Sequence, residues 1–201
     1  MYMKKLFLIS VLSVFTLLST PAQNRWGVMG GINYSSTSAK DINGKLGGYV
    51  GGLYDIELNK SWYVQPQLQF SYEANEAKDK NAAGYKFFTS QYALTLPVLA
   101  SYKINLSDDW SMRIFAGPYA QYALFGRDRQ ATVDSNGKTS SEMGWWHGNF
   151  GDRFNYGLMG GLSVERNHLF FFVEGKYSLK KSALNFDGHG RTLSAGVGYK
   201  F

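Results

Sequence analysis

The residues of this 201-residue chain that could do chemistry are few and scattered. There is no cysteine, which excludes disulfides, thiolate metal sites and cysteine nucleophiles. Nucleophilic catalysis needs a nucleophile beside a base that a third group orients. Two polar segments hold fragments of such a set: His147 with Asp152, and Ser182 with Asp187 and His189. Because polar loops ordinarily contain such residues, the sequence predicts neither an enzyme nor a bound cofactor or metal ion.

A second set of ionisable residues falls within segments in which polar and apolar side chains alternate. From Trp62 to Tyr72, for example, the even-numbered residues are apolar and the odd-numbered ones are mostly glutamines. A period of two is typical of β-strands whose two faces meet different surroundings. The same alternation occurs over eight segments, at 26–34, 46–58, 62–72, 88–104, 110–124, 154–164, 169–179 and 193–201.

The connections between these segments alternate in length. Short links at about 59–61, 105–109 and 166–168 alternate with long polar links at about 35–45, 73–86, 127–152 and 180–190. Bacterial outer-membrane barrels combine an even number of strands with short periplasmic turns and long extracellular loops. The sequence therefore predicts an all-β fold, an eight-stranded antiparallel up-and-down transmembrane β-barrel. Both chain ends and the short turns are expected in the periplasm, and the long loops outside the cell.

The N-terminus has the parts of a signal peptide. Two lysines precede an apolar run from Leu6 to Leu18, and Ala22 supplies a small residue for cleavage. The run is shorter than the roughly 20 residues that a bilayer-spanning helix needs. We therefore expect a cleaved signal peptide at 1–22 and one barrel domain at 23–201. An exported chain does not meet the genome, so the net charge of +6 does not predict nucleic-acid binding.

The polar faces of the segments suit a narrow, filled barrel interior. They carry Gln, Ser, Thr, Gly and Asn with isolated charges, and only 18% of the chain is charged. A face bathed in water would carry more charge, which disfavours a soluble lipocalin-like barrel with its apolar face turned inward. An eight-stranded barrel is filled by its own side chains, so acids and bases inside it must pair. The predicted lumen network comprises Glu57, Lys103, Arg113, Glu165, Glu174 and Lys176.

Large aromatic residues collect at strand ends on the apolar faces. Rings of aromatic side chains at the two lipid–water interfaces are typical of outer-membrane barrels. The girdle predicted at the periplasmic interface comprises Trp26, Trp62, Trp110, Tyr199 and Phe201. The longest loop adds Trp145, Trp146 and Phe150. These three are expected either to form a contact surface for a sugar, a lipopolysaccharide or a protein, or to fold over the barrel mouth or into the aromatic belt.

The final segment alternates up to a terminal aromatic residue, Phe201. Three further motifs accompany it: LTLPVL at 94–99, FAGPY at 115–119 and YGLMGG at 156–161. With these features, essentially the whole mature chain resembles the PorT-like outer-membrane beta-barrel family of Bacteroidota. The resemblance implies a small outer-membrane barrel whose C-terminal Phe201 is recognised by the barrel assembly machinery. A few members of that family are implicated in type IX secretion.

These features predict a monomeric structural or interaction protein of the outer membrane, without enzymatic activity. It is expected to contact outer-membrane lipid and lipopolysaccharide and to act through its outer loops. The first alternative is an accessory role in protein secretion, with a secretion-system or cell-surface partner. A lipid hydrolase at the barrel rim and a soluble lipocalin-like binder are the further alternatives.

Overall fold

The computed structural model describes residues 25–38, 42–78, 86–133, 139–145, 150–182 and 188–201. The signal peptide expected at 1–22 lies outside these described residues. No helix in the described part of the chain is long and apolar enough to cross a bilayer. The elements, in chain order, are β1 (Arg25–Thr37), β2 (Ile42–Glu57), β3 (Trp62–Lys78), β4 (Lys86–Asn105), β5 (Trp110–Val133), β6 (Thr139–Trp145), α2 (Phe150–Arg153), β7 (Phe154–Arg166), β8 (Leu169–Ser182) and β9 (Gly188–Lys200).

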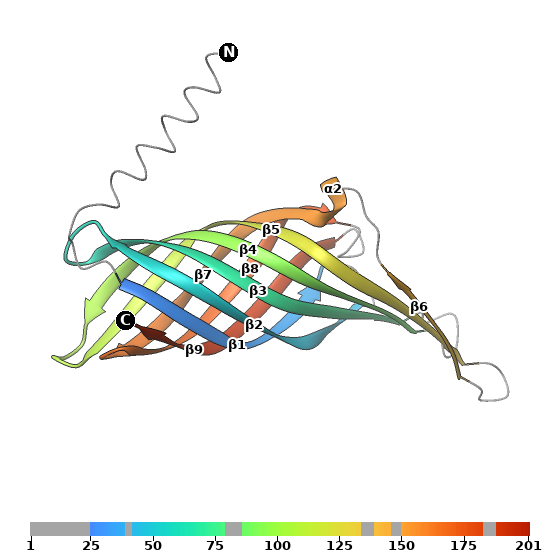
Figure 1. The fold of residues 1–201 in the computed structure, drawn as a ribbon, viewed down its shortest axis with the longest axis horizontal. Coiled ribbons are helices and arrows are strands. Elements are labelled where there is room, and N and C mark those ends of the chain that lie inside the picture. Colours follow the sequence, from blue (N-terminus) through green and yellow to red (C-terminus); the bar gives the residue numbers. More distant parts are fainter. Residues whose placement is uncertain (1–24, 39–41, 79–85, 134–138, 146–149, 183–187) are drawn as a thin grey trace, which may run out of the picture.

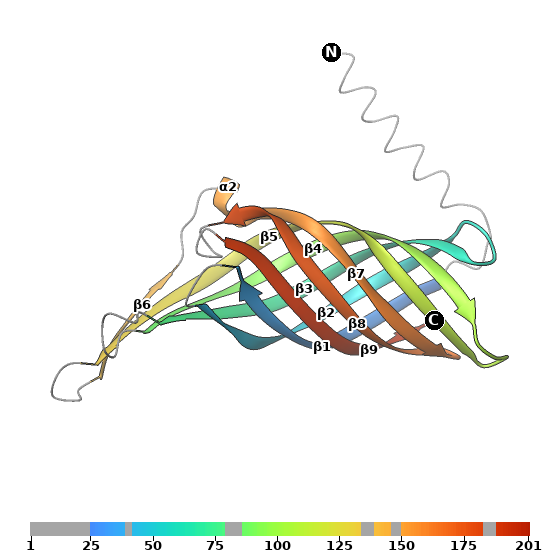
Figure 2. The ribbon, with the colours of Figure 1, turned by 180° about the vertical axis from the view of Figure 1, so that it is seen from behind.

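The strands close into a barrel in which neighbouring strands run antiparallel. β1 pairs with the last strand, β9, and β4 pairs with β5 to complete the circuit. Eight strands, β1–β5 and β7–β9, form the wall (Figures 1 and 2). Closure gives each of them two hydrogen-bonded neighbours, which a bilayer requires because its core offers no water to an unpaired backbone. The predicted eight-stranded antiparallel barrel is confirmed.

The two ends of the barrel differ in their hairpins, because β6 and α2 are inserted at only one of them. At one end, which we call the short-turn end, a few residues join β2 to β3, β4 to β5 and β7 to β8 (Figure 1). The Asn59 side chain accepts hydrogen bonds there from the backbone N–H groups of Ser61 and Trp62, at 3.0 and 2.9 Å. Asn167 adopts a φ of 55°, a conformation that asparagine tolerates. Local turn chemistry therefore fixes the short-turn end, and we call the other end the long-hairpin end.

The prediction of one long loop at 127–152 is wrong in part. β5 continues to Val133, and the chain returns as β6, which pairs with this outer part of β5. On its other side β5 stays paired with β4 as far as Ala131. The backbone therefore satisfies its hydrogen bonds within a sheet that projects beyond the barrel wall (Figure 2), and α2 follows. The loops predicted at 35–45, 73–86 and 180–190 are shorter for the same reason. β1 runs to Thr37 and β2 begins at Ile42, β3 and β4 stay paired out to Lys78, and β8 runs to Ser182 before β9 begins at Gly188.

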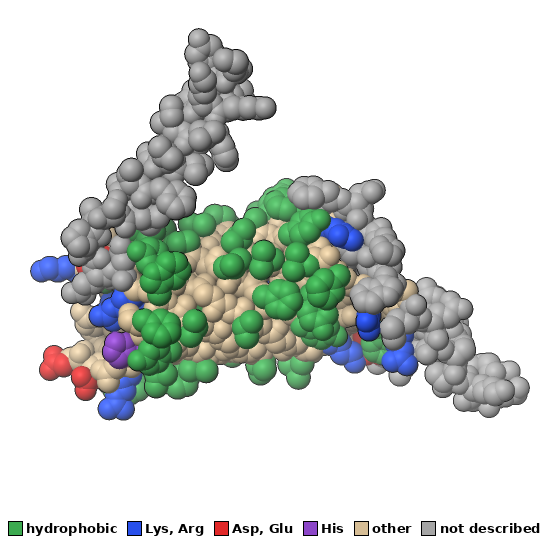
Figure 3. All heavy atoms as spheres, viewed as in Figure 1, with side chains coloured by type: hydrophobic (Ala, Val, Ile, Leu, Met, Phe, Trp, Pro, Cys, Tyr) green, Lys and Arg blue, Asp and Glu red, His purple; other side chains and the backbone are tan. Residues whose placement is uncertain are grey.

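Exposure alternates along the strands of the wall, with apolar side chains outward. Leu68 is 48% exposed, whereas Gln67 beside it is 6% exposed. This orientation excludes the lipocalin-like alternative, in which the apolar face would line the interior. Figure 3 shows the apolar side chains along the side of the barrel, with charged side chains gathered toward its two ends. The outward-facing apolar band includes Val28, Ile32, Val50, Leu68, Leu96, Val98, Ile114, Leu158, Leu162, Phe171, Val173, Leu193 and Val197.

Two apolar clusters share the barrel interior with the polar side chains. They comprise Met29, Tyr49, Leu53, Phe170 and Phe172 in one, and Leu99, Phe115, Tyr119 and Met159 in the other. Glycines of β9 make room for the first cluster, since Gly198 and Gly196 are the register partners of Phe170 and Phe172. A Cβ atom on Gly198 would lie 2.2 Å from Cζ of Phe170. The interior is therefore packed by side chains, as the small circumference of the barrel requires.

Candidate functional site

Four charged side chains from four strands meet in the lumen toward the short-turn end. Nη1 of Arg113 lies 2.9 Å from Oδ2 of Asp55, and its Nε lies 3.0 Å from Oε1 of Glu165. Lys200 contacts the same two carboxylates, with Nζ 2.8 Å from Oδ2 of Asp55. Two bases thus balance two acids, and none of the four side chains is more than 9% exposed. This four-charge cluster meets the condition under which charges can be buried.

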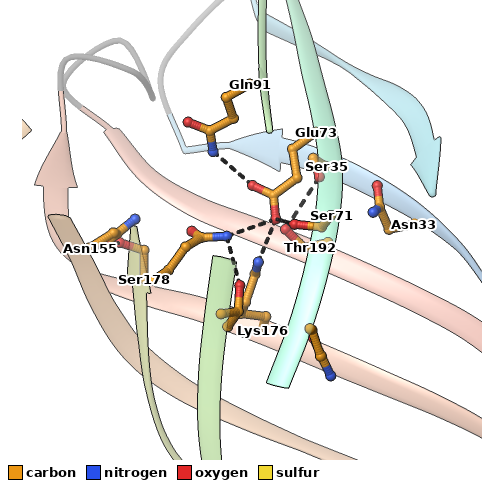
Figure 4. A network of polar contacts seen from close by, with 12 residues as sticks. Asn33, Ser35, Ser71, Glu73, Gln91, Asn155, Lys176, Ser178 and Thr192 are labelled. Atoms are coloured by element: carbon orange, nitrogen blue, oxygen red, sulfur yellow. Dashed lines mark hydrogen bonds and ion pairs between the residues drawn. The ribbon is translucent and has the colours of Figure 1, made fainter. Parts of the chain in front are cut away.

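A second polar cluster surrounds Glu73 of β3, nearer the long-hairpin end (Figure 4). Nζ of Lys176 lies 2.5 Å from the Glu73 carboxylate. Gln91 and Gln121 donate hydrogen bonds to this carboxylate at 2.9 and 3.0 Å, and Ser71 donates at 3.3 Å. The partners come from β3, β4, β5 and β8, so this Glu73 cluster ties four strands together across the lumen.

A row of glutamines on β3, the glutamine ladder, extends from the four-charge cluster. Gln65 donates to Asp55 at 2.6 Å. Gln67 then donates to Gln65 at 2.9 Å, and Gln69 donates to Gln67 at 2.8 Å and to Glu174 at 3.3 Å. Gln65 and Gln67 each donate one hydrogen bond and accept another, so residues two apart on one strand face form a continuous ladder. The free space beside the ladder is about 10 Å³, about the least that a water molecule needs.

Most residues predicted for the lumen network take part in these contacts. The four that do are Arg113, Glu165, Glu174 and Lys176. The other two, Glu57 and Lys103, lie near the short-turn end of their strands. Lys103 lines an open cavity of about 620 Å³ at that mouth, together with Arg25 and residues of the β4–β5 turn. Four of the predicted six therefore lie in the packed lumen, Lys103 lies at the short-turn mouth, and Glu57 lies at the end of β2.

Glu73 falls in a segment that the sequence predicts to be a loop, and it is not among the residues predicted for the lumen. Ser71, Glu73 and Asn75 continue the alternation of the glutamine ladder and are 4%, 8% and 7% exposed. The alternation that extends the strand beyond Tyr72 is therefore visible in the sequence only on the polar face. On the other face the apolar residues end at Tyr72, because the strand continues beyond the apolar band.

The outer surface of β3, β4 and β5 changes character just beyond the apolar band, at the long-hairpin end. Rows of register partners cross the three strands there, first Tyr72–Tyr92–Phe125, then Ala74–Ser90–Arg127, then Glu76–Phe88–Arg129. Two adjoining hollows of about 450 and 480 Å³ lie over these rows and share Tyr72, Ser90 and Arg127. Lys45 of β2 lines the first hollow. We call these two hollows the rim groove.

A β-bulge in β5 turns the two arginines of the rim groove outward. The register of β5 against β4 skips Leu124. Leu124 and the next residue, Phe125, both face outward and are 37% and 43% exposed. One extra residue exchanges the two faces of the strand, so Arg127 and Arg129 face outward instead of into the lumen. These arginines are not among the predicted site residues, although two consecutive apolar residues at the end of an alternating segment signal a bulge.

The residues predicted as a girdle all lie exposed at the short-turn end. They are Trp26, Trp62, Trp110, Tyr199 and Phe201. Trp26 packs against Tyr54 and Trp62 against Tyr102, with ring centroids 4.6 and 5.0 Å apart. Their place at a lipid interface stays a prediction. So does the loop contact surface, because Trp146 and the side chains of Trp145 and Phe150 lie outside the described residues.

Most fragments of a catalytic set also fall outside the described residues. His147 and Asp187 lie there, as do the side chains of Asp152 and Ser182. The His189 ring is described, with Nδ1 2.9 Å from a backbone oxygen of β8. Within the part of the chain that the structure describes, no group of three His, Asp or Glu side chains could hold a metal ion.

Several solved structures are similar to this chain. Ail, the attachment invasion locus protein of Yersinia pestis, is 13% identical, with a TM-score of 0.41 over 89% of this chain and 97% of Ail. OprG from Pseudomonas aeruginosa is 14% identical, with a TM-score of 0.47 over 89% and 96%. Neisserial surface protein A, NspA, is 16% identical, with a TM-score of 0.40 over 90% and 98%. No curated protein sequence matches the chain.

A family model gives the assignment. The model of the outer membrane protein beta-barrel domain matches residues 21–183, which run from β1 through β8. A closed antiparallel barrel with an apolar outer band is the structure that an outer membrane requires of its strands. The chain is therefore a protein of the outer membrane and belongs to the outer membrane protein beta-barrel domain family.

Proposed function

We propose that this protein is a structural or interaction protein with a closed lumen, which acts through the surfaces at its long-hairpin end. The main support for a closed lumen is that side chains fill the barrel interior. The four-charge cluster, the glutamine ladder and the Glu73 cluster occupy the lumen, and about 10 Å³ is free beside the ladder. A diffusion channel needs a continuous path for water, which a barrel of eight strands seldom has room to provide. Binding therefore falls to the outer surfaces.

Planar-bilayer recording on the purified protein tests the closed lumen. We expect no discrete conductance steps from the wild-type barrel. The same preparation must migrate differently on a gel before and after boiling, which shows that the barrel is folded. Conductance steps that change size in Gln69→Ala, which shortens a rung of the ladder, would trace ion flow to the lumen and contradict the proposal.

The proposal includes an orientation, with the long hairpins outside the cell and the short turns and both chain ends in the periplasm. The contrast between short turns and long hairpins supports it. The absence of native cysteine allows single-cysteine labelling. An impermeant maleimide on intact cells should label Gly144→Cys, at an exposed position of β6. It should label Lys60→Cys in the β2–β3 turn only after the outer membrane is opened. The reverse pattern would invert the orientation.

The proposed partners are outer-membrane lipid and a cell-surface molecule, with the barrel as a monomer delivered by the barrel assembly machinery through Phe201. The Phe201 side chain supports that role, since it is 68% exposed. An accessory role in type IX-like secretion is the alternative. Crosslinks in cells from Gly144→Cys to components of a secretion system would favour it. Lipid A from a deletion strain should be unchanged, whereas a rim-located lipid hydrolase would alter it.

A further inference from the structure

The rim groove carries an excess of positive charge. Among the described residues that line its two hollows, three are bases and none is an acid. Arg127 and Arg129 are exposed on β5, and the Lys45 side chain is 43% exposed. The acid next to the groove, Glu76, is 5% exposed and pairs with Lys45. The groove is therefore suited to an anion.

Aromatic rings form the wall of the groove that adjoins the apolar band. Tyr92 packs against Tyr72 and Phe125, with ring centroids 5.1 and 4.7 Å apart. The row beyond it is hollow because two of its three positions carry small side chains, Ala74 and Ser90. A ligand in this hollow would therefore touch aromatic side chains on one side and cationic side chains on the other.

With the predicted girdle residue Trp62 at one lipid interface, strand geometry places the groove at the depth of the headgroups on the other side. Trp62 at the short-turn end and Tyr72 are ten residues apart on β3. At about 3.3 Å per residue and a strand tilt of about 40°, this separation spans about 25 Å across the membrane, the height of a typical apolar band. Arg127 lies one register row beyond Tyr92, the β4 partner of Tyr72. It therefore stands just outside the hydrocarbon, where headgroup phosphates lie.

We propose that the rim groove binds the phosphorylated sugar headgroup of an outer-leaflet glycolipid. Guanidinium groups hold phosphate oxygens through paired N–H donors, and Arg127 and Arg129 stand on the same face of one strand. The exposed part of the Tyr92 ring offers an apolar surface to a sugar, and the acyl chains continue down the apolar band. A soluble phosphate would leave that band unused, so the ligand is a lipid. The inference rests on the proposed orientation, because this glycolipid occupies the outer leaflet.

Native mass spectrometry of the purified barrel in detergent, titrated with diphosphoryl lipid A, tests the proposal. Arg127→Gln/Arg129→Gln removes both guanidinium groups. Arg191→Gln is the matched control, because Arg191 is an exposed arginine near the long-hairpin end of β9, 5.9 Å from the centre of a tyrosine ring and outside the groove. We expect the double variant to bind about tenfold more weakly or worse, and Arg191→Gln to stay within about twofold of the wild type. All three proteins must keep the gel shift of a folded barrel.

Two results would overturn the proposal. Equal binding by the wild type and the double variant would remove the arginines from the site. An equal loss in Arg191→Gln would show that any exposed arginine suffices. Inorganic phosphate is added at the lipid concentration in a further titration, and we expect no competition; competition would reassign the groove to a soluble anion. Detergent exposes both ends of the barrel, so this titration does not depend on the orientation in cells, which the maleimide experiment tests separately.

Discussion

Arg113→Met tests whether balanced charge holds the barrel interior together. The Arg113 side chain is 4% exposed and lies between the carboxylates of Asp55 and Glu165. Methionine keeps an unbranched, flexible side chain in that place but brings no charge. In the variant, Lys200 alone faces two carboxylates, and the cluster holds one uncompensated negative charge.

The expected loss in the free energy of unfolding is about 3 to 5 kcal/mol. The substitution removes two of the four base–acid contacts in the cluster, those of 2.9 and 3.0 Å. The carboxylates left behind are 1% and 9% exposed, so water replaces the lost partner poorly, and least at Asp55, because Glu165 also lines the cavity at the mouth. Glu165→Gln restores the balance by leaving Asp55 with Lys200. We therefore expect Arg113→Met/Glu165→Gln to lose about 2 kcal/mol or less, although it changes two residues.

Urea unfolding of the refolded barrel in lipid vesicles, followed by tryptophan fluorescence, measures these losses. Arg191→Met is the control for removing an arginine, and because its side chain is exposed we expect a change within about 0.5 kcal/mol. If Arg113→Met and Arg113→Met/Glu165→Gln are equally destabilised, charge imbalance is not the cause and the reasoning is refuted. Lost packing around position 113 would then account for both.

Three further predictions concern the faces, the terminus and the packing of the barrel. Leu68→Arg on the outer face should impair insertion at a cost of about 2 to 4 kcal/mol near the midplane, and Gln67→Arg on the lumen face should be milder; equal folding yields in vesicles would contradict the face assignment. Deletion of Phe201 should lower assembly in cells more than refolding in detergent, and unchanged assembly in cells would remove the residue from the recognition signal. Gly198→Ala should cost about 1 to 3 kcal/mol in urea unfolding. Its Cβ would lie 2.2 Å from a phenylalanine ring, whereas Gly175→Ala, with its nearest neighbour at 4.0 Å, should be close to neutral.

The barrel wall could be predicted because the bilayer imposes the same rule on every strand. Leu68 faces lipid and Gln67 faces the lumen, so the sequence alternates wherever the chain crosses the membrane. β6 and the outer part of β5 could not be predicted in this way. Beyond the bilayer both faces of the sheet meet polar surroundings, and pairing there no longer requires an alternating pattern. The sequence pattern therefore predicts the part of each strand that crosses the membrane more accurately than it predicts the ends of the strand.

The contacts within the lumen could not be predicted, because alternation states which side chains face inward but not at which level. Asp55 and Arg113 are 58 residues apart in sequence, and Glu73 and Lys176 are 103 apart. Their meeting depends on the stagger of the strands around the barrel. The bulge at Leu124 adds a second difficulty, since one skipped residue reverses the faces of everything that follows. The rim groove depends on that reversal.

The lumen is filled with paired charges, whereas the rim groove is open and carries an excess of positive charge. The residues that stabilise the barrel are therefore different from those proposed to bind a ligand. Inside, charges are paired across strands and about 10 Å³ is free beside the ladder, so a ligand would have to break ion pairs to enter. At the rim, cationic side chains lie over hollows of about 450 and 480 Å³ on a wall that the lumen contacts keep rigid. A rigid wall holds Arg127 and Arg129 in register before a ligand arrives, which lowers the cost of binding. Arg113→Met should therefore reduce stability while its folded fraction binds lipid A like the wild type, and Arg127→Gln/Arg129→Gln should reduce binding with little effect on stability. Loss of binding in folded Arg113→Met would show that the two regions are coupled.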